Sequence, residues 1–283
     1  MTDPKSSSQM THALPHALGQ DGLVGSTRRL LGCRAVFLDY DGTLTPIVSR
    51  PELAVLSDDV RDRVDRLSVF RPVTIVTGRD ISDARQLVGI DRLGYVGSHG
   101  LDVTGPAGSG LRREVAAELG PELDAAESEI RRRTAAIDGV LVERKRFSIS
   151  THVRLVDASL RAQVDAVVDA VGRAHRSLRR ERGKMLYELR PDVDWDKGAA
   201  VRWLLDGMSI DPSAALYIGD DLTDETAFAA LAGRGVTIVV ADPEVDRSTV
   251  AQFRLDGPAD VYELLGRLVH LIEQESPRPP RLP

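Results

Sequence analysis

The chain has 283 residues, of which 42% are hydrophobic and 28% charged, and its formal net charge is −6. This composition is typical of a globular protein that buries a full core, in one large domain or two ordinary ones. The acidic balance argues against nucleic acid or an anionic membrane as partner, and no stretch approaches the roughly 20 apolar residues of a membrane helix. The single cysteine, Cys33, excludes an internal disulfide and fits a reducing compartment. We expect a cytoplasmic protein and take it to be a monomer.

Both ends of the chain have the composition of unpacked segments. Residues 1–25 are rich in Ser, Gly, Pro and His and lack a sustained apolar run, which predicts a flexible N-terminal tail and not a signal peptide. Residues 276–283 are rich in Pro and Arg and are predicted to be a second flexible tail.

Between these ends, short continuous apolar runs alternate with amphipathic stretches. The runs predict buried parallel strands at Ala35–Leu38, Val73–Val76, Leu93–Val96, Ala215–Ile218 and Val236–Val240. The amphipathic stretches predict helices at Asp58–Leu67, Ile81–Val88, Lys197–Leu205 and Asp224–Leu231. The alternation predicts a Rossmann-like α/β fold with a parallel sheet, in which ligands bind beyond the carboxyl ends of the strands.

This rhythm changes near Thr104. A Gly-rich loop at 105–110 precedes a long helical stretch, and alternating segments and a further helix follow as far as Leu189. We therefore predict a smaller α/β domain at 105–189, inserted into a core formed by 26–104 and 190–275, with the loop and residues 190–192 as the crossings.

The first candidate site lies where the first predicted strand ends, at Val36–Thr45. Asp39 and Asp41 stand two positions apart and so point the same way, and Gly42 permits a sharp exit that aims backbone N–H groups at an anion. Paired carboxylates can divide their work, one as nucleophile and one as general acid. The plainer alternative is an Asp-rich turn, since Asp-Gly is common in turns.

A second group of carboxylates follows another predicted strand. Asp220 and Asp224 are four residues apart, so one helical turn brings them to the same side, and Asp221 lies between them. Oxygen ligands of this kind suit Mg²⁺. A helix cap is the alternative, but a cap needs one Asp, and clustered anions repel one another unless a cation joins them.

Two more residues complete the pattern at the same sheet edge. Thr77 places a hydroxyl after the second strand, and Lys197 opens a helix with a compact positive charge suited to a phosphoryl group. Each is common on surfaces, but four such elements at four strand ends together indicate a site.

The order DxDGT, Thr, Lys, GDDxxD resembles that of the haloacid dehalogenase phosphatases. The resemblance implies that Asp39 attacks phosphorus and forms an aspartyl phosphate, and that Asp41 protonates the leaving oxygen and then activates water. It implies that Thr77 and Lys197 hold the phosphoryl oxygens. The residues that it places around a Mg²⁺ cofactor are Asp39, Asp41 through its carbonyl, Asp220, Asp224 and, orienting the others, Asp221.

The inserted domain corresponds to a cap, which encloses small phosphorylated metabolites. Several segments are similar to the trehalose-6-phosphate phosphatases: Thr45–Ile47, Gly97–Gly100, Val142–Lys145, Ser148, His152–Arg154 and Tyr187–Pro191. In that family, residues matching Glu143, Lys145 and Glu188 grip sugar hydroxyls, and the resemblance adds Arg154, Gly100 and His99.

Simpler interpretations remain open for these residues. Glu143 and Lys145 could form an exposed ion pair, and His99 could be a satisfied histidine in a tight loop. Arg79 could support the phosphate or pair with a nearby acid.

The sequence therefore predicts a Mg²⁺-dependent enzyme that hydrolyses trehalose 6-phosphate. The alternatives are a phosphatase of sucrose phosphate or of a glycosyl-phosphoglycerate, a phosphomutase, and, in another class, a phospho-receiver or regulatory domain. A receiver needs neither the second carboxylate, Asp41, nor a cap.

Overall fold

The structure is a computed structural model that describes residues 8–20, 22–23, 27–48, 50–183, 185–242 and 244–275. The chain divides into two compact units. The first is Met1–Arg113 with Trp195–Pro283, and the second is Glu114–Asp194.

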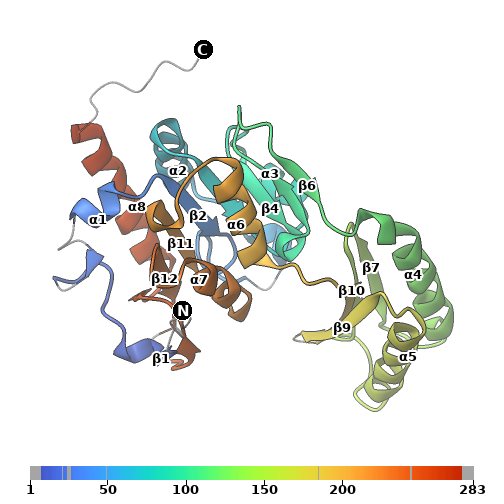
Figure 1. Ribbon diagram of the computed structural model, residues 1–283. Coiled ribbons are helices and arrows are strands. Elements are labelled where there is room, and N and C mark those ends of the chain that lie inside the picture. Colours follow the sequence, from blue (N-terminus) through green and yellow to red (C-terminus); the bar gives the residue numbers. More distant parts are fainter. Residues whose placement is uncertain are drawn as a thin grey trace, which may run out of the picture. The chain divides into compact units, whose positions relative to one another are not determined.

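The first unit is built around an eight-stranded sheet (Figure 1). In spatial order its strands are β14 (Phe253–Leu255), β12 (Val236–Val240), β11 (Ala215–Gly219), β2 (Ala35–Asp39), β3 (Val73–Val76), β4 (Gly94–Gly97), β5 (Asp102–Thr104) and β6 (Arg112–Glu114). The strands from β14 to β4 are parallel, and β5 runs antiparallel to β4. This confirms the predicted Rossmann-like α/β class, and all five strands predicted for the core are present within one or two residues.

Helices cover both faces of this sheet. One face packs against α1 (Thr27–Leu31), α2 (Asp58–Phe70), α3 (Ile81–Val88) and α8 (Pro258–Glu275), and the other against α6 (Lys197–Gly207) and α7 (Glu225–Leu231). Strand β2 illustrates why both faces need to be covered, because its apolar side chains alternate between them. Val36 and Leu38 lie in the first apolar cluster, and Ala35 and Phe37 lie in the second. Short 3₁₀ helices join the elements, at Thr11–Ala13 (η1), Pro51–Leu53 (η3), Ser98–Gly100 (η4), Ala117–Leu119 (η5), Pro212–Ala214 (η6) and Leu222–Asp224 (η7).

Residues 8–20, here called the N-terminal segment, are packed, contrary to the predicted tail. Strand β1 (Gln9–Met10) pairs with β13 (Ser248–Thr249), and the side chains of Leu14 and Ala17 are buried in the core clusters. The composition misled the prediction because a few small and apolar residues suffice to seat a segment along an existing sheet edge. The other predicted tail residues, at 1–7, 21, 24–25 and 276–283, lie outside the described residues.

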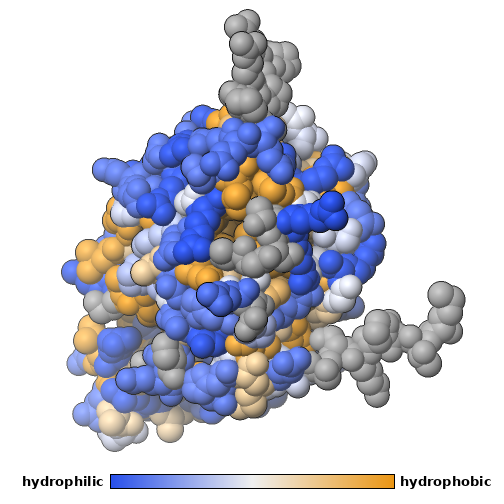
Figure 2. Space-filling view, turned by 90° about the vertical axis from the view of Figure 1, so that its left-hand side faces the viewer, coloured by the Kyte–Doolittle hydropathy of each residue, from blue (hydrophilic) through white to orange (hydrophobic). Residues whose placement is uncertain are grey.

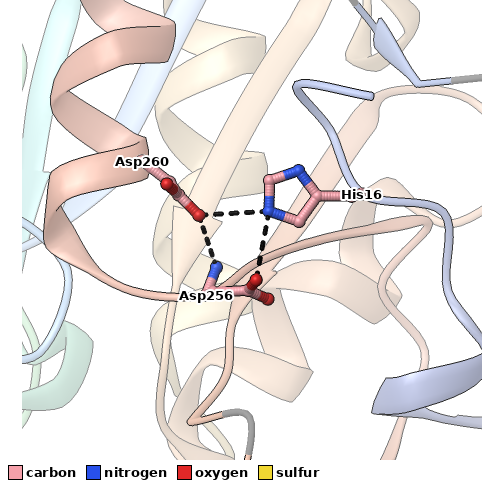
Figure 3. A group of neighbouring side chains, drawn as sticks. All are labelled: His16, Asp256 and Asp260. Carbon is pink, nitrogen blue, oxygen red and sulfur yellow. Dashed lines mark hydrogen bonds and ion pairs between the residues drawn. The ribbon is translucent and has the colours of Figure 1, made fainter. Parts of the chain in front are cut away.

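His16 fastens this segment to the start of α8. Its Nε2 lies 3.1 Å from Asp260 Oδ2 and 3.5 Å from Asp256 Oδ2, and Figure 3 shows the ring pointing at both carboxylates. The Leu18 N–H donates to His16 Nδ1 over 3.3 Å, so in the neutral ring Nε2 carries the proton and donates it to the acids. The three residues are therefore a hydrogen-bonded clip between two segments far apart in sequence.

The second unit has a four-stranded antiparallel sheet. Its strands, in spatial order, are β7 (Leu141–Lys145), β8 (Ser148–His152), β10 (Leu186–Pro191) and β9 (Leu178–Gly183). Helices α4 (Gly120–Thr134) and α5 (Arg161–Ala174) bury Val142, Ile149 and Leu189 against one face. The alternate residues of the strands form the other face, which is mainly polar but also carries Leu141 and Leu186 near one end.

The inserted unit begins later than predicted. The Gly-rich loop at 105–110 does not cross between domains, because Gly105 N–H donates to Leu111 O over 2.8 Å and the chain turns back to form β6 of the core sheet. The boundaries therefore lie at Glu114 and Asp194 and not at 105 and 189.

Within the described residues, no helix has both the length and the apolar character needed to cross a membrane. On the face seen in Figure 2, apolar side chains lie in several separate places among hydrophilic ones.

Candidate active site

Asp39 is the last residue of β2 and lies at the carboxyl edge of the core sheet. Its side chain is 7% exposed. The loop that follows turns at Gly42, which has φ +86°. A Cβ on Gly42 would lie 2.1 Å from Asp220 Oδ2, so the loop after β2 can approach the loop after β11 only without a side chain there. The glycine of DYDGT thereby brings the two acidic motifs together.

Lys197, the first residue of α6, lies buried between two carboxylates. Its Nζ donates to Asp39 Oδ1 over 2.7 Å and to Asp224 Oδ1 over 2.8 Å. Burial alone would lower the pKa of Lys197, but the charges of Asp39 and Asp224 more than offset this and hold the pKa above its ordinary value. Lys197 is therefore a fixed ammonium group at the edge of the sheet.

Asp224 is fully buried and is held by several donors. Besides Lys197, the Tyr217 hydroxyl donates to its Oδ1 over 2.6 Å, and the Asp221 N–H donates to its Oδ2 over 3.0 Å. Burial, followed by the charges of Asp224 and Asp39, raises the pKa of Tyr217 well above its usual range, so Tyr217 remains a donor. These bonds use most of the lone pairs of Asp224, which fits a role in orienting Lys197 better than that of a principal metal ligand.

Asp220 lies beside Asp39, with a carboxylate oxygen within 4.8 Å of one of the Asp39 oxygens. The Thr43 hydroxyl donates to Asp220 Oδ1 over 3.3 Å. Burial, and next the charge of Asp224, raises the pKa of Asp220 from its ordinary 3.8 to about 7. Burial also raises the pKa of Asp39 well above its ordinary value, against the opposing charge of Lys197. Both shifts report buried negative charge that is incompletely balanced.

This group of carboxylates fits a divalent cation. Asp39, Asp220 and Asp224 each place an oxygen within 4.8 Å of the others. Three carboxylates facing the one ammonium of Lys197 leave an excess of negative charge, which a cation would neutralise, and an all-oxygen set is what Mg²⁺ prefers. The Asp221 carboxylate does not join the group, since it is exposed and accepts the Thr223 hydroxyl over 3.2 Å.

Asp41, the predicted general acid, is paired with Arg79. The guanidinium donates from Nε to Asp41 Oδ2 over 2.7 Å and from Nη2 to Oδ1 over 2.6 Å. Arg79 thus contacts both oxygens of Asp41, and each oxygen keeps a second lone pair that can carry or accept a proton. Of the two interpretations of Arg79 from the sequence, the structure shows the pairing with an acid.

Thr77, His99 and Gly100 meet at the ends of β3 and β4. Thr77 is 2% exposed, and its Oγ1 accepts the Arg79 N–H over 3.1 Å. The His99 N–H donates to Thr77 O over 3.2 Å, and His99 has a left-handed backbone with φ +56°. Gly100, at φ +110°, leaves room for the start of α6, because a Cβ there would lie 2.6 Å from the main-chain oxygen of Asp196. The predicted substrate residue Gly100 therefore has a structural reason to be glycine.

In the second unit, Glu143, Lys145 and Glu188 lie on the polar face of the sheet. This follows from alternation, since Val142 and Leu189 beside them face the helices. His152 Nε2 lies 3.0 Å from Glu143 Oε2.

Glu188 is held on the same face by two hydroxyls. Ser148 and Ser150 donate to its Oε1 over 2.8 and 3.2 Å. Arg154 does not share this face by alternation, because it lies in the turn after β8, where it is exposed.

Sequence reasoning missed three kinds of residue. Tyr217 is a polar side chain inside an apolar strand, and that irregularity was its signal. The sequence places Ser148 and His152 within the similar segments but without a role, and it does not single out Ser150; their shared alternation in β8 could have placed all three beside Glu143 and Glu188. Arg247, which donates to the Asp220 main chain, lies in a loop without a recognisable motif.

The parallel core sheet with an inserted unit is the fold of the haloacid dehalogenase-like hydrolases. A solved structure of one from Bacteroides thetaiotaomicron matches with a TM-score of 0.61 at 15% identity, covering 83% of this chain and 99% of that chain. The buried Asp39, Lys197 and Asp224 and the half-buried Asp220 lie at the carboxyl edge of this sheet, where ligands bind in such folds.

The chain belongs to the trehalose-phosphatase family, whose model matches residues 37–259. It is 42% identical over 238 residues to the trehalose-phosphate phosphatase of Mycobacterium marinum, which covers 83% of this chain and 61% of that protein. The solved C-terminal domain of C. albicans trehalose-6-phosphate phosphatase matches with a TM-score of 0.72 at 25% identity, covering 91% of this chain and 99% of that one. The chain thus spans about three fifths of the length of the M. marinum relative.

Proposed function

We propose that this chain hydrolyses trehalose 6-phosphate to trehalose and phosphate, with Asp39 as the nucleophile. The observation that supports this most is the buried contact of Lys197 with Asp39 and Asp224 beside Asp220, within a chain of the trehalose-phosphatase family. Family membership also weighs against the phospho-receiver alternative.

In this proposal the chemistry belongs to the core unit. Asp39 attacks phosphorus, the bond from phosphorus to the sugar oxygen breaks, and an aspartyl phosphate forms. Asp41, held by Arg79, gives a proton to the leaving sugar oxygen, and it then takes a proton from the water that hydrolyses the intermediate. Lys197 and Thr77 bind the phosphoryl oxygens, while Tyr217 and Asp224 keep the Lys197 ammonium in position.

Mg²⁺ is the proposed cofactor. Asp39 and Asp220 would hold it with the Asp41 carbonyl, and Asp224 would stand behind them. When bound it supplies positive charge that neutralises the phosphoryl group.

The second unit would supply substrate selection. Glu143, Glu188 and Lys145 lie on a polar sheet face, and half-exposed carboxylates of this kind accept paired sugar hydroxyls. We propose Arg154, His99 and Gly100 as further contacts on the strength of the family resemblance. A cytoplasmic location and a monomeric state remain predictions from the sequence.

Phosphate release from purified protein tests this function. We expect hydrolysis of trehalose 6-phosphate that stops in excess chelator and returns with Mg²⁺. Asp39→Asn should remove activity while the circular dichroism spectrum stays that of the parent. Asp59→Asn is the matched control, since Asp59 is 67% exposed on α2, and it should remain active.

A substrate panel decides the specificity. Faster hydrolysis of sucrose 6-phosphate or glucosyl-3-phosphoglycerate than of trehalose 6-phosphate would overturn the proposed substrate, and substantial activity of Asp39→Asn would overturn the proposed nucleophile.

A further inference from the structure

The loop after β12 reaches back to the acidic motif through Arg247. Its Nη2 donates to the main-chain oxygen of Asp220 over 2.8 Å, and its Nη1 pairs with Glu225 Oε1 at 2.5 Å. The other oxygen of Glu225 accepts the Val250 N–H over 2.9 Å. Asp220 is the second residue of the GDDxxD segment and Glu225 directly follows its last one, so one guanidinium holds both sides of this turn against the loop.

Thr11 in the N-terminal segment holds this loop in place. The Thr11 N–H donates to Arg247 O over 2.9 Å, and the Arg247 N–H donates back to Thr11 Oγ1 over 3.2 Å. The Thr11 hydroxyl lies 3.0 Å from Asp246 Oδ1, which also accepts the His12 N–H. Thr11 is fully buried, and the His16 clip described above fastens the same segment to the start of α8.

The surroundings of Arg247 set it apart from an ordinary surface arginine. Its side chain is 20% exposed, and together with Asp220 and Gly42 it lines a pocket of about 430 Å³. An exposed ion pair contributes little to stability, but a charged donor on a main-chain oxygen fixes the backbone from which the Asp220 carboxylate projects. Residues that orient a metal ligand typically change metal affinity about 10- to 100-fold when they are removed.

We infer that Arg247 is a positioning residue for the cation site and that Thr11 supports it from the N-terminal segment. The inference rests on the proposed function only in taking Asp220 as a metal ligand. Removing the guanidinium leaves Asp39, Asp220 and Lys197 in the chain but frees the loop that carries Asp220. Mg²⁺ then binds a less ordered set of ligands.

Calorimetric titration of the full-length chain with Mg²⁺, in the absence of substrate, tests this directly. Arg247→Met should weaken Mg²⁺ binding by about tenfold or more, and Arg247→Lys should recover part of the loss. Thr11→Val, which removes one hydroxyl at similar volume, should weaken binding by about two- to fivefold. Arg234→Met is the matched control, because Arg234 pairs with Asp211 at 2.8 Å on an exposed surface, and the two residues precede β12 and β11, at the sheet edge opposite the carboxyl ends that carry the site.

The activity of the same variants separates positioning from a general loss of structure. With Arg247→Met, we expect a rise in the Mg²⁺ concentration that gives half-maximal rate, while kcat in saturating Mg²⁺ stays within about threefold of the parent. A lower Tm with unchanged Mg²⁺ affinity would reduce Arg247 to a structural residue and overturn the inference. So would an equal loss of affinity in the Arg234 control.

The proposed substrate and the positioning role of Arg247 can fail separately. If Arg247→Met weakens Mg²⁺ binding but the parent does not hydrolyse trehalose 6-phosphate, the substrate is wrong and the positioning role stands. A parent chain that binds no Mg²⁺ by calorimetry would overturn the positioning role together with the proposed cofactor.

Discussion

The core site and the polar face of the second unit hold their carboxylates in different ways. In the core, Asp39, Lys197 and Asp224 are at most 7% exposed, and their partners come from β2, α6, β11 and the turn that precedes α7. On the polar sheet face, Glu143 is 49% exposed, and β8 alone supplies the partners described for Glu143 and Glu188.

The difference teaches which part of the molecule can vary. A buried charge that loses its partner is costly, so each member of the core group constrains the others. A half-exposed carboxylate can exchange a neighbouring hydroxyl for a ligand hydroxyl at little cost. The core group therefore suits chemistry that requires fixed charges, and the open sheet face suits the proposed recognition of a sugar, which must be admitted and released.

Among the changes predicted below, Lys197→Met should have the largest effect on stability and activity. A small effect would contradict the contrast between the core group and the polar sheet face. The change removes the only ammonium described between Asp39 and Asp224 and leaves two buried carboxylates facing each other. We expect a loss of about 3–5 kcal/mol in the free energy of unfolding, measured by urea denaturation in chelator, and no phosphatase activity. A variant as stable as the parent would show that the core group is less constrained than its burial indicates.

The pH dependence of stability without metal is the second test. The pKa of Asp220 rises from its ordinary 3.8 to about 7 on folding, so between these values the folded chain keeps a proton that the unfolded chain has lost. Stability in chelator should therefore fall as the pH rises from about 4 to 7, by on the order of 4 kcal/mol at about 1.4 kcal/mol for each pKa unit, and then level off. Thermal melts in chelator and in excess Mg²⁺ measure this.

Mg²⁺ should reverse that trend, because the cation binds the deprotonated carboxylates. The increase in Tm on adding Mg²⁺ should grow with pH over the same range. An increase that is independent of pH would place the metal away from Asp220.

Removing the two hydroxyls that hold Glu188 should have the smallest effect on activity. It tests whether the polar sheet face contributes to substrate binding without contributing to the chemistry. In Ser148→Ala with Ser150→Ala, both donors to Glu188 Oε1 are lost, while the carboxylate remains. We expect KM for trehalose 6-phosphate to rise by about five- to tenfold with little change in kcat. Hydrolysis of p-nitrophenyl phosphate, which has no sugar, should keep its rate, and an equal loss with both substrates would assign these serines to folding.

Much of the fold and the core site could be predicted from the sequence because their signals are local. Asp39, Lys197 and Asp220 directly follow or precede strongly apolar or amphipathic elements, and parallel strands bring such ends to one edge. The pairing of Asp41 with Arg79 could not be decided, because it depends on the side-chain torsions of a loop residue.

The N-terminal segment and the limits of the inserted unit could not be predicted for a different reason. Thr11 and Ala17 are buried by partners more than 230 residues away, and no local pattern reports such contacts. The loop at 105–110 has the composition of a linker, but a hairpin turn has the same composition. A linker and a hairpin turn differ in whether the following strand pairs with the sheet, and tertiary contacts decide that pairing.

The seating of the N-terminal segment also bears on association between molecules. Strand β14 ends the order of the core sheet, and it carries main-chain groups on the side away from β12. Arg254 N–H donates to Pro15 O over 3.1 Å, and Ala17 N–H donates to Arg254 O over 2.8 Å, so the segment uses groups that would otherwise template a further strand. An uncovered sheet edge is a starting point for strand-to-strand aggregation. A stretch of sequence with the composition of a loose end thus protects one border of the sheet from pairing with another copy.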